Sequence, residues 1–188
     1  MKKLFILFVL LCSVAVSNAQ EKETEKPQSK AALFENSIGS LIRKESYVLP
    51  RVGGAEMDVV ILTDIITGTK IGCLRMKTKY HRPYTEPDIF ETYAGYIDFE
   101  ELDAAIKSLS YIKETILPTT PDVDTRFTFN FKDGGELRID FNEKTKKWVF
   151  SIYTTIKLYS ETKCDVTQLS EMIEIMKTAK SKIQELTK

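Results

Sequence analysis

Alternating apolar and polar residues predict strands in two separate stretches of the chain. Four segments of the first stretch have this pattern or are rich in β-branched residues: 41–49, 57–66, 70–77 and 92–97. Pro50 and Gly53-Gly54 are expected to end the first strand. Thr67-Gly68 separates the second strand from the third, which predicts a β-hairpin.

The second stretch repeats this pattern between residues 126 and 153. Phe127, Phe129 and Phe131 alternate with polar residues, and Asp133-Gly134-Gly135 follows as a strong turn signal. Two returning strands are expected next, with apolar faces formed by Leu137, Ile139 and Phe141 and by Trp148, Phe150 and Ile152. Residues 156–159 are expected to extend the last strand or to form another. These aromatic faces are interpreted as sheet core.

Two amphipathic helices follow the two strand stretches. Asp98 with Glu101, and Asp165 with Gln168, have the spacing of a capping box at a helix start. Apolar residues then recur every three or four positions in each helix. The first face comprises Phe99, Leu102, Ala105, Ile106, Leu109 and Ile112; the second comprises Val166, Leu169, Met172, Ile173, Met176, Ala179, Ile183 and Leu186.

Together these elements predict an α+β fold with an antiparallel β-sheet and both amphipathic helices packed on one face. The sheet would comprise two β-meander-plus-helix units, at about 38–117 and 122–188, within a single domain from 38 to 188. The similar helix starts are consistent with a duplication, but also with two independent capped helices that each follow a strand. Leu33, Phe34 and Ile38 could add one helical turn that caps the core.

The N-terminus has the pattern of a secretory signal peptide. Lys2 and Lys3 precede an apolar run over 4–16, and Ser17-Asn18-Ala19 provides small residues for cleavage after Ala19. We therefore expect signal peptide 1–19, a flexible charged linker over 20–37, and export to the periplasm or the extracellular medium. Lipid attachment at Cys12 is not expected, because the large Leu11 precedes it.

The balance of charge argues against two classes of partner. Without Lys2 and Lys3 the chain has 25 basic and 27 acidic residues. This balance gives no support for nucleic-acid binding, which usually shows a basic excess, nor for a polybasic contact with a membrane surface. No integral membrane segment is expected after residue 20. The expected partner is therefore an unknown protein or a small-molecule ligand.

Cys73 and Cys164 leave two alternatives open. An exported protein can form a disulfide, and one between these residues would close a long loop. The other interpretation is two separate buried thiols. A metal site is not expected, because two distant cysteines and the single histidine lack metal-ligand spacing. No cofactor is expected either, since Gly53-Gly54 and Gly134-Gly135 have the context of turns and not of phosphate-binding loops.

Candidate chemistry is concentrated in a long predicted loop over 78–91. It contains the candidate ligand- or partner-binding residues Tyr80, His81, Arg82, Tyr84 and Glu86. A non-enzymatic binding module is the leading hypothesis, since no recognisable catalytic motif is present. The alternatives are a small exported enzyme that uses His81 with Glu86 or Asp88, and a structural accessory protein of the cell envelope. A purely structural loop, stiffened by proline, explains the same residues without function.

Overall fold

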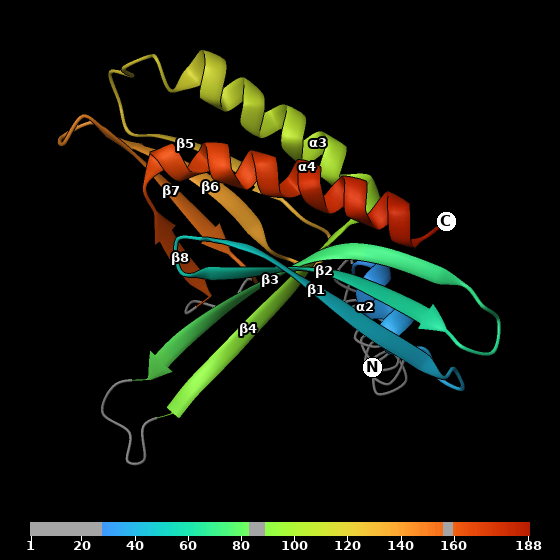
Figure 1. The fold of residues 1–188 in the computed structure, drawn as a ribbon. Coiled ribbons are helices and arrows are strands. Elements are labelled where there is room, and N and C mark those ends of the chain that lie inside the picture. The colour runs from blue at the N-terminus through green and yellow to red at the C-terminus, as the bar shows by residue number, and fades with distance from the viewer. Residues whose placement is uncertain (1–27, 83–88, 156–159) are drawn as a thin grey trace, which may run out of the picture.

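The computed structural model describes residues 28–82, 89–155 and 160–188, and it shows two four-stranded antiparallel sheets with two longer helices (Figure 1). Sheet A has the order β1-β2-β3-β4, formed by Ile42–Val52, Ala55–Asp64, Lys70–Arg82 and Ile89–Asp98. Sheet B has the order β5-β6-β7-β8, formed by Thr125–Asn130, Glu136–Asn142, Lys147–Tyr153 and Glu161–Cys164. The helical elements are α2 (Lys30–Glu35), α3 (Phe99–Tyr111), the π-helical η1 (Ile112–Ile116), the 3₁₀ turn η2 (Val166–Gln168) and α4 (Leu169–Leu186).

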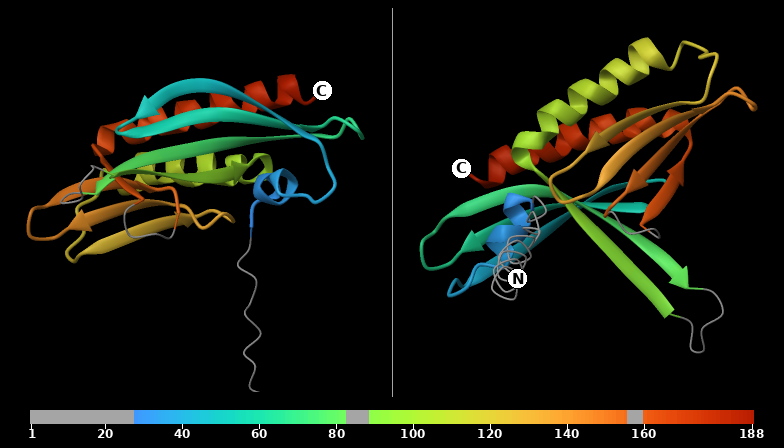
Figure 2. Two further views of the ribbon diagram at one scale, coloured as in Figure 1. Left: turned by 90° about the horizontal axis from the view of Figure 1, so that it is seen from below. Right: turned by 180° about the vertical axis from the view of Figure 1, so that it is seen from behind.

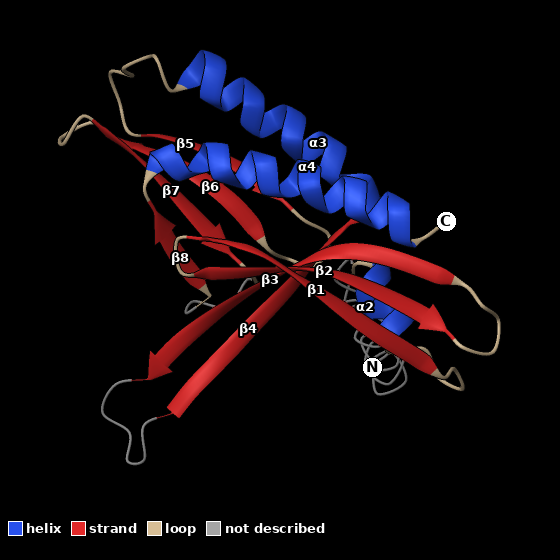
Figure 3. Ribbon diagram, viewed as in Figure 1, coloured by secondary structure: helices blue, strands red, loops and turns tan. Residues whose placement is uncertain are grey.

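The α+β class with two β-meander-plus-helix units is therefore confirmed. Each sheet pairs its strands in chain order, and each meander leads into a longer helix, α3 or α4 (Figure 3). The eight strands are divided between two sheets, a separation that the sequence analysis did not anticipate. Both longer helices pack against sheet A.

One hydrophobic cluster joins both sheets and both longer helices. The register pairs Val59 with Leu74 in sheet A and Ile139 with Phe150 in sheet B, and all four side chains are buried in this cluster. Helix α4 approaches β3 closely at Gly72, where an added β-carbon would lie 2.5 Å from a methyl group of Ile183. Burial of apolar surface from both units in one cluster makes the two sheets a single packed structure.

Both predicted capping boxes are present. The backbone N–H of Asp98 donates to the Glu101 carboxylate at 3.0 Å, and that of Asp165 donates to the Gln168 side chain at 3.1 Å. Each aspartate directly follows the last strand of its sheet or ends it. The helix starts were thus correctly located, although η2 precedes α4 as a short 3₁₀ turn.

Three predicted strand limits were wrong. Strand β1 continues through Pro50 to Val52, with a register irregularity between Leu49 and Val52. An edge strand tolerates proline because one side of its backbone needs no partner. The predicted loop over 78–91 is mostly strand, since β3 extends to Arg82 and β4 begins at Ile89. Strand β8 was not predicted, and residues 156–159 lie outside the described residues.

Helix α2 lies inside the segment 20–37 that was predicted to be a linker. Its N-cap Ser29 and its residue Ala31 are fully buried, so the folded domain includes them. The backbone N–H groups of Lys30 and Ala31 donate to the Asp98 carboxylate at 2.8 and 3.2 Å. The predicted helical turn is present, but Leu33 and Ile38 are exposed while Phe34 packs against the sheet.

The predicted signal peptide 1–19, including Cys12, lies outside the described residues. Among the residues that are described, none belongs to a helix with the length and apolar character needed to cross a membrane.

Candidate functional site

The outer part of the β3–β4 hairpin forms an arm that projects from the body of the molecule (Figure 2). The pairing of β3 with β2 ends at Lys77 and Glu56, whereas β3 and β4 remain paired from Thr78↔Tyr93 to Arg82↔Ile89. We call these two paired segments, 78–82 and 89–93, the arm. In Figures 1 and 2 the arm extends away from both longer helices and from sheet B.

The base of the arm is fixed against the β7–β8 connection. Thr78 is buried, and its hydroxyl lies 3.0 Å from the Thr154 hydroxyl and 3.3 Å from the Ser160 carbonyl oxygen. Close to this contact, an added β-carbon at Gly95 would lie 2.0 Å from the Thr154 carbonyl oxygen. The two chain segments therefore touch at backbone level, and this contact fixes the direction in which the arm leaves the core.

The arm contains three of the five predicted binding residues. Tyr80, His81 and Arg82 lie at the end of β3, and Tyr80 is paired in register with Glu91 of β4. Tyr93 donates a hydrogen bond to Glu91, so the described part of the arm adds two residues that the sequence analysis did not single out.

The remaining predicted residues lie outside the described part of the structure. Tyr84, Glu86 and Asp88 fall within 83–88, and the side chains of His81 and Arg82 are not described. The catalytic alternative based on His81 with Glu86 or Asp88 therefore stays a prediction.

A group of charged side chains lies beside the base of the arm, and we call it the cationic cluster. Its cations are Arg51, Arg75, Lys77 and Lys79, and they surround the carboxylates of Glu56 and Asp58. The Glu56 carboxylate forms ion pairs with Arg51 at 2.8 Å, Lys79 at 3.1 Å and Lys77 at 3.3 Å. The Asp58 carboxylate forms ion pairs with Arg75 at 2.8 Å and with Lys77 at 2.9 Å. Four positive charges thus share two negative ones.

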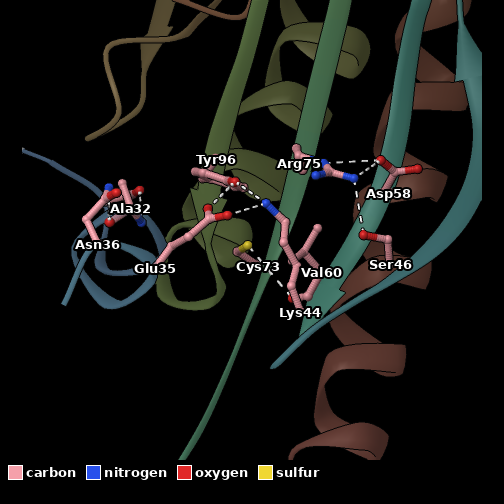
Figure 4. A network of polar contacts seen from close by, with 11 residues as sticks. Ala32, Glu35, Asn36, Lys44, Ser46, Asp58, Val60, Cys73, Arg75 and Tyr96 are labelled. Carbon is pink, nitrogen blue, oxygen red and sulfur yellow. Dashed lines mark hydrogen bonds and ion pairs between the residues drawn. The ribbon is translucent and has the colours of Figure 1, made fainter. Parts of the chain in front are cut away.

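Asp58 forms the buried centre of this cluster. Burial acts to raise the pKa of its carboxyl, but the hydrogen bonds from Arg75 and Lys77 outweigh burial and hold the pKa below its ordinary value. Arg75 also donates to the Ser46 hydroxyl at 3.2 Å, as Figure 4 shows. Because its charge is fully engaged, Asp58 acts as a structural anchor for the cations and not as a proton-transfer group.

A second polar network fastens helix α2 to the same face of sheet A (Figure 4). The Tyr96 hydroxyl donates to Glu35 at 2.6 Å, and Lys44 donates to the Tyr96 oxygen at 3.0 Å and to Glu35. Burial opposes ionisation of Glu35, yet the bonds from Lys44 and Tyr96 keep its pKa below the ordinary value. Glu35, Lys44 and Tyr96 are thus hydrogen-bonded to one another, and we interpret the network as the attachment of α2 to the sheet.

The structure has no disulfide between Cys73 and Cys164. Both thiols are free and buried, as the second interpretation of the sequence expected. Cys73 belongs to a small cluster under α2, whereas Cys164 belongs to the main core beside Gly53. Burial raises the pKa of the Cys73 thiol to about 12 and that of Cys164 to about 11. Neither has the low pKa of a reactive cysteine.

The described residues offer limited means to hold a cofactor or a metal ion. Among them, no group of three or more His, Cys, Asp or Glu side chains is placed to bind a metal. A hollow of about 170 Å³ lies between the start of α3 and the end of α4, lined in part by Lys70, Phe99 and Thr187. Its charged rim is already paired, since Lys30 bonds to Glu100 and Lys70 donates to the Leu186 carbonyl.

The sequence analysis did not single out the cationic cluster, although its signal is present in the chain. Arg75, Lys77 and Lys79 occupy alternate positions of one strand, and Glu56 and Asp58 occupy alternate positions of the strand beside it. Comparisons of the chain with protein-family models, with curated proteins and with solved structures give no match.

Proposed function

We propose that this chain is an exported, non-enzymatic binding module that contacts a protein partner through the β3–β4 arm. One observation carries this proposal: the arm extends past β2 as two paired strands, and its described side chains lie outside the main cluster. A two-stranded hairpin is at best marginally stable in water by itself. An arm whose described side chains add little to the core, but which remains attached to it, is therefore best explained by contact with a partner.

The shape and attachment of the arm support a protein partner. Small molecules usually bind in concave pockets, whereas the arm is a protrusion. Its base is held by the Thr78 contacts and by the close approach of Gly95 to Thr154. A rigid base lowers the entropy that is lost when a protruding element binds.

Site-specific photo-crosslinking in the producing organism tests the arm as a contact surface. A photoreactive phenylalanine analogue is placed at Thr92, which is exposed on the arm, and at Tyr111, which is exposed on α3, as the control. We expect one protein to be captured from position 92 and not from position 111. That protein, once purified, should bind a Tyr80→Ala/Thr92→Ala variant more weakly than the original chain. Equal capture from both positions would contradict the proposal.

Export is tested separately on the protein isolated from the same cells. The N-terminal sequence of the mature chain should begin at Gln20, as cleavage after Ala19 requires. A chain that retains residues 1–19 and stays in the cytoplasm would contradict export. That result would not bear on the arm, which the crosslinking experiment tests independently.

A further inference from the structure

The cationic cluster lies on the face of sheet A that the longer helices leave uncovered. Arg75, Lys77 and Lys79 alternate along β3 with Leu74 and Met76, which are buried in the main core. Because side chains alternate between the two faces of a strand, the three cations share the opposite face. Lys79 belongs to the arm, so this row of positive charge leads from the sheet onto the arm.

The charges of the cluster do not balance. Four cations are held by two carboxylates, and Glu56 alone contacts three of them. On the other side of β3, the residues paired with Arg75, Lys77 and Lys79 are Tyr96, Ala94 and Thr92, which are all uncharged. Within the cluster itself, as the described residues form it, an excess of about two positive charges therefore remains.

Two of the cations are available for a further contact. The side chains of Arg51 and Lys79 are 66% and 62% exposed, although both touch Glu56. An ammonium group has three donors and a guanidinium group has five, so each can bind a second carboxylate without leaving the first. Alternate residues of a strand lie about 6.5–7 Å apart, which is also the repeat of alternate side chains in any other extended chain.

We propose that the partner of the arm is an acidic protein segment, bound in an extended conformation along Arg51, Lys77 and Lys79. This inference rests on the proposed binding function of the arm and adds the chemistry of the partner. Carboxylates at alternate positions of the segment match the spacing of Lys77 and Lys79 on β3. Arg51 lies on β1 and is reached through the same carboxylate, Glu56, that Lys77 and Lys79 contact. The segment supplies the negative charge that Glu56 and Asp58 provide only in part.

A labelled synthetic peptide with glutamate at alternate positions and threonine between them is the probe. Its binding to the purified chain is measured by fluorescence anisotropy at about 0.15 M salt, where exposed charges farther apart than about 8 Å are largely screened. The variant Arg51→Glu/Lys79→Glu should weaken binding by about tenfold or more. The control Arg43→Glu/Lys163→Glu changes the net charge equally at two other positions, on β1 and β8, and should leave the affinity nearly unchanged.

Glu56→Gln provides a test in the opposite direction. It removes the carboxylate that competes for Arg51, Lys77 and Lys79, so the acidic peptide should bind more tightly to this variant. A purely structural role of the cluster predicts no such gain. Equal weakening by both double variants, or tighter binding of polyphosphate or anionic vesicles than of the peptide, would overturn the proposal.

The crosslinked partner separates this inference from the proposed function. If the protein captured at position 92 is lost from the Arg51→Glu/Lys79→Glu variant and retained by Arg43→Glu/Lys163→Glu, both proposals are supported. If both variants retain it, the acidic segment is refuted while the binding function of the arm stands. If position 92 captures nothing beyond the control, the proposed function itself fails.

Discussion

Gly95 of β4 lies against the backbone of Thr154, the residue that follows β7, so closely that a β-carbon at Gly95 would be 2.0 Å from the Thr154 carbonyl oxygen. Two hydrogen bonds close to this contact support it. Tyr96 donates its N–H to Asp133 in the β5–β6 turn at 2.9 Å, and Thr78 bonds to Thr154. These contacts tie the first unit of the chain to the second at the base of the arm.

Gly95→Ala should therefore destabilise the whole domain. The obstructing atoms belong to backbone, which cannot move aside as a flexible side chain can, and overpacking of this kind costs about 3 kcal/mol. We expect a corresponding loss in the free energy of unfolding in urea. Gly54→Ala is the matched control, because its added β-carbon would meet its nearest neighbour, a Thr162 methyl group, at an ordinary 3.5 Å. Similar losses in both variants would refute the backbone contact.

Asp98 should be the more important of the two helix-capping aspartates. It is buried, and its carboxylate accepts hydrogen bonds from the N–H groups of Lys30 and Ala31 in addition to its place at the start of α3. Asp98→Ala leaves these donors without that partner. It should lower the free energy of unfolding, measured in urea, by roughly 2–4 kcal/mol. Asp165→Ala, which removes a cap at α4 alone, should cost less. Equal losses would show that α2 contributes nothing through Asp98.

The sequence predicted the elements whose signals are local. The hairpin turn before Lys70, the capping boxes at Asp98 and Asp165 and the alternation in β5 to β7 are each determined by neighbouring residues, and the structure confirms them. The division into two sheets depends on contacts between distant residues, such as Gly95 with Thr154, that carry no local signal. Strand β8 is four residues long, too short for alternation to identify it.

The candidate site was predicted less completely than the fold. Residues 78–82 were interpreted as loop because Pro83 and Pro87 follow them in the sequence, yet β3 extends to Arg82. The cationic cluster depends on the register that places Glu56 opposite Lys77 and Asp58 opposite Arg75. Strand pairing must be known before charges on different strands can be matched, so this feature came from the structure.

Asp58 should make stability depend on pH. Burial acts to raise its pKa, but Arg75 and Lys77 hold it below the ordinary 3.8, so the folded state binds its proton less readily than the unfolded state. The stabilisation from Asp58 is therefore complete at neutral pH and is lost as the pH falls below about 5. Asp58→Asn should lower the free energy of unfolding by about 2 kcal/mol at pH 7, and this difference from the original chain should shrink toward pH 3. A difference that stays constant across urea titrations from pH 7 to pH 3 would contradict the ion pairs.

Helix α2 should control access to the Cys73 thiol. Ala31 of α2 is buried in the cluster that contains Cys73, Val60 and Leu62, and burial raises the pKa of this thiol to about 12. In a Cys12→Ser/Cys164→Ser background, Ala31→Asp places a charge in that cluster and should detach α2, so that Cys73 reacts with a disulfide reagent at pH 8 about tenfold faster or more. Leu33→Asp adds the same charge at an exposed position of the same helix and should leave the rate unchanged. If both variants react at the original rate while urea exposes the thiol, Cys73 is protected by the sheet itself and α2 is not its cover.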